Sequence, residues 1–242
     1  MLEIKNLSFA VEEEGREKDI IHDLSLTIET GKFVVITGPN GSGKSTLARL
    51  LMGIEKPIAG QILLDGEDIT GLGITERARR GVSFAFQQPV RFKGIRVQDL
   101  LRLASGKNLS VSTACSYLSE VGLCARDYID REINASLSGG ELKRIEIATL
   151  LARHTKLSVF DEPEAGIDLW SFQNLIRIFE KMRREIQDSS IVIISHQERI
   201  LQIADEILVL AGGRITHRGS PEEILPELMG KEAPANICQR LQ

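Results

Sequence analysis

Short runs rich in β-branched and other apolar residues recur along most of the chain. Five of them cover residues 33–37, 82–86, 157–160, 191–195 and 207–210. Between several of these runs lie longer stretches with helical periodicity, notably residues 141–153 and 170–186. Apolar strands that alternate with helices are typical of a mostly parallel sheet covered on both faces. We therefore predict an α/β fold built around such a sheet.

Two segments depart from this pattern. Residues 2–28 alternate apolar and polar positions around an acidic, glycine-containing turn at 12–19, which indicates antiparallel strands at an edge. Residues 89–136 contain no clear apolar strand, but they contain helical stretches at 97–104 and 112–121. We expect this second segment to be a helical subdomain inserted into the α/β core.

Ser220, Pro221 and Glu223 form a helix-start pattern, with serine as the cap, proline at the first helical position and an acid three residues after the cap. This helix would run to about residue 229, followed by a loose tail. The expected domains are an α/β core over 1–88 and 137–229, an antiparallel β subdomain in about 1–30 of it, a helical insert over 89–136 and a tail over 230–242.

The composition limits what the chain can do. Its 242 residues are 42% hydrophobic and 26% charged, with a formal net charge of −4. A negative net charge gives no general attraction to nucleic acid, and no apolar stretch is long enough to span a membrane, so we expect neither nucleic-acid binding nor direct membrane insertion. The acidic start and three cysteines without close pairing favour a cytoplasmic protein. Two interpretations of Cys238 remain, an incidental thiol or a cluster or metal ligand, and the first is favoured.

Residues 38–46 carry the strongest chemical signal. Their sequence, Gly-Pro-Asn-Gly-Ser-Gly-Lys-Ser-Thr, fits G-x-x-x-x-G-K-[ST] between a predicted strand and a predicted helix. Glycines let the backbone curl so that N–H groups point at phosphate oxygens, and the helix start adds partial positive charge. Lys44 would reach the β- and γ-phosphates, and Ser45 would hold Mg²⁺. The predicted ATP-binding residues of this loop are Gly38, Pro39, Asn40, Gly41, Ser42, Gly43, Lys44, Ser45 and Thr46.

Two further patterns fit the same chemistry. Asp161 and Glu162 end an apolar strand, where Asp161 would support Mg²⁺ and Glu162 would polarise the attacking water. Acids at a strand end also serve as helix caps, but the phosphate loop upstream favours catalysis. Ser138, Gly139 and Gly140 precede an amphipathic helix and present a hydroxyl and free N–H groups to an anion. A cap alone explains Ser138 but not two successive glycines, which weaken a helix start.

With these three motifs the chain resembles the ABC ATPases over essentially residues 1–228. The resemblance implies that Gln87 links the Mg²⁺ site to the helical insert, that Asp168 reaches across a dimer, and that His196 contacts the γ-phosphate. Two subunits would close head to tail, with ATP between the phosphate loop of one and residues 138–140 of the other. The catalytic residues implied by the resemblance are Lys44, Gln87, Glu162 and His196. The further ATP-binding residues are Ser138, Gly139, Gly140 and Asp168. The Mg²⁺ ligands are Ser45, Gln87 and Asp161.

Within the ABC ATPases the chain is similar to SufC, the ATPase subunit of the SUF iron–sulfur cluster assembly system. Transport subunits usually stack an aromatic residue on adenine where this chain has Val11. Segments 85–90, 131–134, 138–144 and 196–201 also resemble SufC. The insert is shorter than in bacterial SufC proteins, and Gln88 and Gln197 stand where that family often has tyrosine. The alternative is the ATP-binding subunit of an ABC membrane transporter that lacks the adenine stack.

The SufC resemblance implies two partners, a second ATPase subunit and a scaffold resembling SufB, or SufB with SufD. The scaffold would dock on the helical insert around residues 91–103, next to Gln87. Charge reversal at Arg91, Lys93 and Arg96 would then abolish scaffold binding. A non-transport ABC protein of translation or DNA repair is disfavoured, because such proteins carry tandem cassettes or a long coiled-coil insert and this chain has neither.

Overall fold

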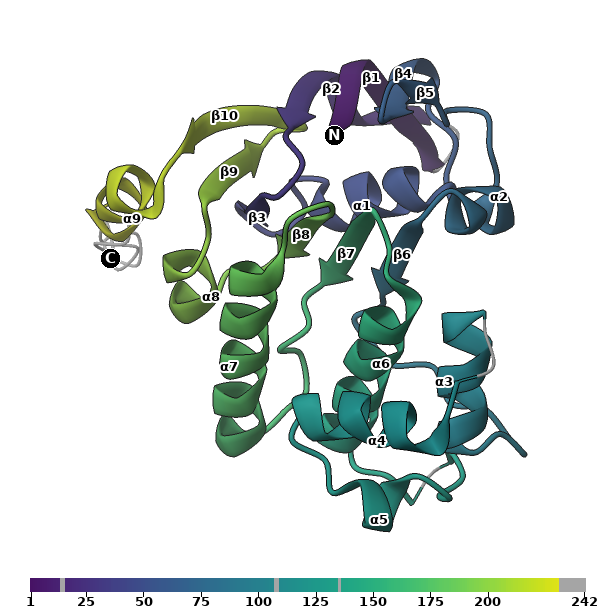
Figure 1. The fold of residues 1–242 in the computed structure, drawn as a ribbon. Helices are drawn as coiled ribbons and strands as arrows, with labels where there is room; N and C mark the ends of the chain where they lie inside the picture. Colours follow the sequence, from purple (N-terminus) through teal and green to yellow (C-terminus); the bar gives the residue numbers. More distant parts are fainter. Residues whose placement is uncertain (14–15, 107–108, 135, 231–242) are drawn as a thin grey trace, which may run out of the picture.

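The computed structural model describes residues 1–13, 16–106, 109–134 and 136–230. Its main element is a six-stranded sheet with the order β10-β9-β3-β8-β7-β6 (Figure 1). The strands are β3 (Phe33–Thr37), β6 (Val82–Ala85), β7 (Leu157–Asp161), β8 (Ser190–Ile194), β9 (Glu206–Ala211) and β10 (Arg214–Gly219). Within this described sheet, β10 alone pairs antiparallel, and every residue of β3, β7 and β8 is buried. The predicted α/β fold with a buried, mostly parallel sheet is confirmed.

A second, four-stranded sheet has the order β2-β1-β4-β5. Its strands are β1 (Leu2–Glu13), β2 (Arg16–Ile28), β4 (Ala59–Leu64) and β5 (Glu67–Asp68). Strand β1 pairs antiparallel with β2, as the alternating pattern predicted, and also with β4. Strand β4 was not predicted, because only Ile62 and Leu64 are fully buried in it and it carries no continuous apolar run.

Helix α1 (Lys44–Met52) lies between the two sheets (Figure 1). Its apolar side chains share one buried core with β1 and with one face of the parallel sheet. That core includes Leu47, Leu50 and Leu51 of α1, Leu2 and Ile4 of β1, Val34 and Ile36 of β3, and Val192 of β8. A nine-residue helix is marginal by itself in water, so this packing fixes α1 and the loop before it.

The other face of the parallel sheet packs against α6 (Gly139–Arg153) and α7 (Leu169–Glu185), in a second core that continues into the helical insert. The insert contains α3 (Val97–Ser105), α4 (Val111–Glu120) and α5 (Ala125–Tyr128). The remaining helices are α2 (Ile74–Arg79), α8 (Glu198–Gln202) and α9 (Pro221–Gly230). Among the described residues, no helix combines the length and apolar character needed to cross a bilayer. Most of the predicted tail, with Cys238, lies outside the described residues.

Candidate active site

The phosphate loop predicted over residues 38–46 joins the end of β3 to the start of α1. Gly38 has a φ of 142°, and a Cβ at this position would lie 1.9 Å from the carbonyl oxygen of Leu210. Gly43 precedes α1 with a φ of 99°, and no side chain caps this helix start. The loop therefore requires glycine at both positions. The first N–H groups of α1 remain available to phosphate oxygens.

Lys44 is buried at the start of α1, and its Nζ donates to the carbonyl oxygens of Gly38 and Pro39 at 2.8 and 2.9 Å. Burial lowers the pKa of Lys44 from its usual value, while the charges of Glu162 and Asp161 act to raise it. The site thus holds an ammonium group beside two carboxylates. A lysine ammonium has three N–H donors, so phosphate oxygens can serve as its acceptors in this position.

The three residues predicted to hold Mg²⁺, Ser45, Gln87 and Asp161, line one cavity of about 420 Å³. Ser45 Oγ donates to Asp161 Oδ1 at 3.2 Å. Burial raises the pKa of Asp161 above its usual value, and the hydrogen bond from Ser45 only partly opposes this shift. Magnesium prefers oxygen ligands and binds through one or two carboxylates together with phosphates and water. The hydroxyl, amide and carboxylate oxygens of these residues fit such an ion.

Glu162 follows β7 and adopts a left-handed backbone conformation with a φ of 44°. Its N–H donates to the carbonyl oxygen of Ile194 in β8 at 2.9 Å, and its Oε2 accepts a hydrogen bond from Gln87 Nε2 at 2.6 Å. A non-glycine residue in this conformation costs about 1–3 kcal/mol and persists where its surroundings hold it. The structure therefore brings Gln87 and Glu162 together from segments 75 residues apart in the sequence.

Ser138 caps α6. Its Oγ accepts a hydrogen bond from Glu141 N at 3.2 Å, and its own N–H donates to Glu141 Oε2 at 2.6 Å. Ser138 and Gly139 are exposed, so the hydroxyl of Ser138 and the N–H of Gly139 can be reached by an anion. A Cβ on Gly140 would lie 2.6 Å from Ser171 Oγ, so glycine lets the start of α6 pack against the start of α7. Packing between the two helices is therefore a second reason for glycine at position 140.

Asp168 caps α7. Its Oδ1 accepts from the N–H of Ser171 at 3.0 Å, and its Oδ2 accepts from the hydroxyl of the same residue at 2.8 Å. Both carboxylate oxygens are thus used within the chain, and the contribution of Asp168 to ATP binding stays a prediction. His196 follows β8, is exposed, and lines a cavity of about 520 Å³ together with Gly38. The structure therefore places His196 beside the phosphate loop.

One buried pair next to this site was not predicted from the sequence. Ser195 Oγ donates to Glu164 Oε1 at 2.5 Å, and the other carboxylate oxygen of Glu164 is buried without a hydrogen-bond partner among the described residues. Burial raises the pKa of Glu164, while Ser195 and the charge of His196 act to lower it. The only signal was an acid two positions after Glu162. Its partner lies 31 residues away, and no local pattern indicates it.

The sequence profile of the ABC transporter family matches residues 21–165, more than half of the 242 residues. The chain belongs to the ABC transporter family of ATPases. It is 37% identical to MJ0035, an uncharacterized ABC transporter ATP-binding protein of Methanocaldococcus jannaschii, over 86% of this chain and 85% of that protein. It is 35% identical to a probable ABC transporter ATP-binding protein of Streptococcus pyogenes serotype M3, over 100% of this chain and 96% of that protein.

The fold of this ABC ATPase is shared with a solved structure, the ATP-binding cassette MJ0796 in a dimeric post-hydrolysis state bound to ADP and Pi. The TM-score is 0.80 at 22% identity, over 91% of this chain and 99% of that chain. Membership of the family confirms the prediction of an enzyme that hydrolyses ATP. The names of the relatives favour the transporter alternative over the SufC resemblance.

Proposed function

We propose that this ABC ATPase is the ATP-hydrolysing subunit of a membrane transporter, and that two copies close head to tail around two ATP molecules. One observation carries the proposal: the groups suited to a nucleotide lie in two separate places. Lys44 of the phosphate loop lies near Asp161, at the end of β7, and near Glu162, just after it, whereas Ser138 lies exposed at the start of α6, beside α7. A second copy can supply the missing half of each site. The dimeric state named for MJ0796 supports this arrangement.

In the closed pair, Lys44 and the first N–H groups of α1 bind the β- and γ-phosphates. Mg²⁺, held by Ser45 and Asp161, supplies charge neutralisation when bound. Glu162 polarises the attacking water, and Gln87 holds its carboxylate in place. The hydroxyl of Ser138 accepts from Glu141 N, so its proton stays free to bond the γ-phosphate of the other subunit. Hydrolysis removes that contact, which favours opening.

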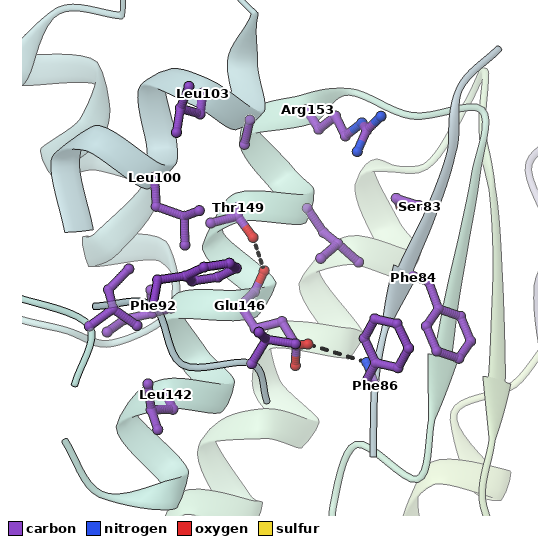
Figure 2. Close-up of a pocket in the computed structure, with 15 residues that line it drawn as sticks. Ser83, Phe84, Phe86, Phe92, Leu100, Leu103, Leu142, Glu146, Thr149 and Arg153 are labelled. Atoms are coloured by element: carbon purple, nitrogen blue, oxygen red, sulfur yellow. Dashed lines mark hydrogen bonds between the residues drawn. The ribbon is translucent and has the colours of Figure 1, made fainter. Parts of the chain in front are cut away.

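A partner would dock in an apolar groove of about 360 Å³ between β6 and the helical insert. Figure 2 shows the side chains that line this groove. Phe86 lies on one side of it and Phe92 and Leu103 on the other, and these three side chains are 42%, 36% and 70% exposed. Arg91 and Lys93 are exposed on the same segment as Phe92. Exposed apolar groups beside positive charge fit a short amphipathic helix that carries acids. Its source would be the membrane-embedded subunit.

The substitution Glu162→Gln tests the catalytic part of the proposal. It keeps the hydrogen bond to Gln87 but removes the charge, so we expect MgATP to bind and turnover to fall by about a hundredfold or more. The ATP-bound dimer should then accumulate in size-exclusion chromatography. Glu185→Gln is a matched control, because Glu185 is exposed at the end of α7. Wild-type turnover in Glu162→Gln would contradict the assigned role.

Affinity purification from the native cell tests the partner. We expect a membrane protein with several spans to co-purify, and Arg91→Glu with Lys93→Glu to abolish its capture. Arg96 is left unchanged because it pairs with Asp99 at 3.3 Å. Arg126→Glu, on the exposed helix α5, is the control. Unchanged capture by the double reversal would refute docking in the groove.

A SufC-like function is the second candidate, and Val11 is the observation that favours it. Val11 lies on β1 opposite Lys18 of β2 and is 37% exposed, so no aromatic ring is available there to stack on adenine. In this case the same purification would capture a soluble scaffold resembling SufB or SufD. Capture of a scaffold without any membrane protein would overturn the transporter proposal in favour of this one.

A further inference from the structure

A buried ion pair on α6 holds the backbone just before Gln87. Glu146 Oε1 accepts a hydrogen bond from Phe86 N at 3.2 Å, and Lys143 Nζ donates to Phe86 O at 2.5 Å. The two side chains also pair with each other, Lys143 Nζ to Glu146 Oε2 at 3.0 Å. Both main-chain polar groups of Phe86 are thus bound by side chains of one helix. Figure 2 shows Glu146 directed at the Phe86 N–H.

This pair is unusually well buried for two charges. The side chains of Lys143 and Glu146 are 2% and 14% exposed. Burial raises the pKa of Glu146, while the charge of Lys143 acts to lower it. Desolvation makes a buried ion pair expensive, and an apolar pair of similar volume often stabilises a protein equally well or better. Fold stability alone is therefore a weak reason for these residues.

The contacts lead directly into the active site. Phe86 is the first residue after β6, and the next residue, Gln87, donates to Glu162 at 2.6 Å. Fixing both polar groups of Phe86 limits the rotation of the peptide that carries Gln87. The helix that supplies the pair is α6, whose N-cap is Ser138. One rigid element therefore connects the exposed serine turn to the glutamine.

We propose that Glu146, paired with Lys143, is a positioning residue for ATP hydrolysis: it holds Phe86 so that Gln87 keeps Glu162 in its working orientation. The inference rests on the role proposed for Gln87. Glu146 acts at a distance from the nucleotide, so its loss lowers kcat rather than ATP affinity. Lys143 is less suited to a test, because its charge also acts on Asp161.

The test is a double-mutant cycle between Glu146→Gln and Gln87→Ala, measured as steady-state ATP hydrolysis. A misplacement of about 1 Å in a catalytic group can cost about a hundredfold, so we expect Glu146→Gln to lower kcat about ten- to a hundredfold with an unchanged KM. In the Gln87→Ala background, Glu146→Gln should have no further effect. An equal loss of kcat in both backgrounds, or no loss in the wild-type background, would overturn the proposal.

Two further variants separate positioning from folding. Lys143→Met with Glu146→Leu replaces the pair by apolar groups and removes two partners of the Phe86 main chain, so we expect the protein to keep a cooperative unfolding transition and to lose at least as much kcat as Glu146→Gln. Thr149→Val is the matched control on α6, because Thr149 lines the same groove and its hydroxyl donates to the main-chain oxygen of Glu146, so the variant leaves the Glu146 side chain unchanged. Wild-type kcat in the apolar double variant refutes the inference. If Gln87→Ala alone leaves kcat unchanged, the proposed role of Gln87 is wrong, and the positioning role of Glu146 is wrong with it. The catalytic role of Glu162 is tested separately by Glu162→Gln.

Discussion

Arg77 stabilises the end of the helix that carries the phosphate loop. It is fully buried in α2, and its guanidinium donates to four carbonyl oxygens, those of Leu50, Leu51, Thr70 and Leu72, at 2.5 to 3.0 Å. Leu50 and Leu51 belong to the last turn of α1, whose carbonyl groups have no partner within the helix. We predict that Arg77→Met removes the donor of all four carbonyl groups and markedly destabilises the protein, although Leu50 O keeps its hydrogen bond from Gly53 N at 3.1 Å.

The magnitude follows from the balance of burial and hydrogen bonding. Burial lowers the pKa of Arg77 to about 10, so the residue remains charged at neutral pH. A shift of this size from the usual 12.5 corresponds to a cost of about 3 kcal/mol for keeping the charge inside. Four charged hydrogen bonds contribute about 1.5–3 kcal/mol each, which exceeds this cost. Removing the guanidinium leaves neutral carbonyl oxygens without this donor, at about 1–3 kcal/mol each, so we expect a loss of about 3–5 kcal/mol in total.

Urea unfolding followed by circular dichroism measures the effect. Arg77→Lys retains a charge but has fewer donors and no fixed fork, so we expect it to lose roughly half as much stability as Arg77→Met. Arg79→Met is the matched control, because Arg79 is exposed two positions further along α2 and should change stability by less than about 0.5 kcal/mol. A loss below about 1 kcal/mol for Arg77→Met, or an equal loss for Arg79→Met, would refute the reasoning.

Three further predictions concern the site. Gly38→Ala places a Cβ 1.9 Å from the Leu210 carbonyl oxygen, so calorimetry should detect no ATP binding; wild-type affinity would contradict the proposed loop geometry. Trp170, the only tryptophan in the sequence, is 76% exposed at the start of α7, and MgATP should shift its fluorescence to shorter wavelength in the Glu162→Gln variant. An unchanged spectrum in a confirmed dimer would place α7 away from the interface. Burial acts to raise the pKa of Glu141, but hydrogen bonds from Tyr128 and from Ser138 N outweigh this effect. The pKa of Glu141 therefore lies below its usual 4.5. The stability that Glu141 contributes is therefore present at neutral pH and is lost as pH falls through the lowered pKa of Glu141. The Tm difference between wild type and Glu141→Gln should shrink in acid. A difference that stays constant with pH would exclude a stabilising role of the ionised Glu141.

The fold and much of the chemistry followed from local patterns. The buried strand β3 was predictable because all its residues are apolar or β-branched, and the phosphate loop because glycine spacing and a following lysine have few other uses. Helix α6 was predictable from its cap, but the predicted amphipathic pattern was wrong, because the helix is buried on several faces. Strand β4 was missed because half-buried strands carry a weak signal that tertiary pairing with β1 overrides.

Side-chain roles that depend on distant partners were decided only by the tertiary structure. Arg77 has the sequence context of an ordinary surface arginine, yet its four acceptors lie 5 to 27 residues away. Glu146 and Lys143 lie three residues apart, as in many exposed helical ion pairs, yet they hold a backbone 57 to 60 residues away. Sequence periodicity reports which face of an element is buried. Which polar groups meet inside that buried region depends on how the elements pack, because a polar group removed from water must find its partners there.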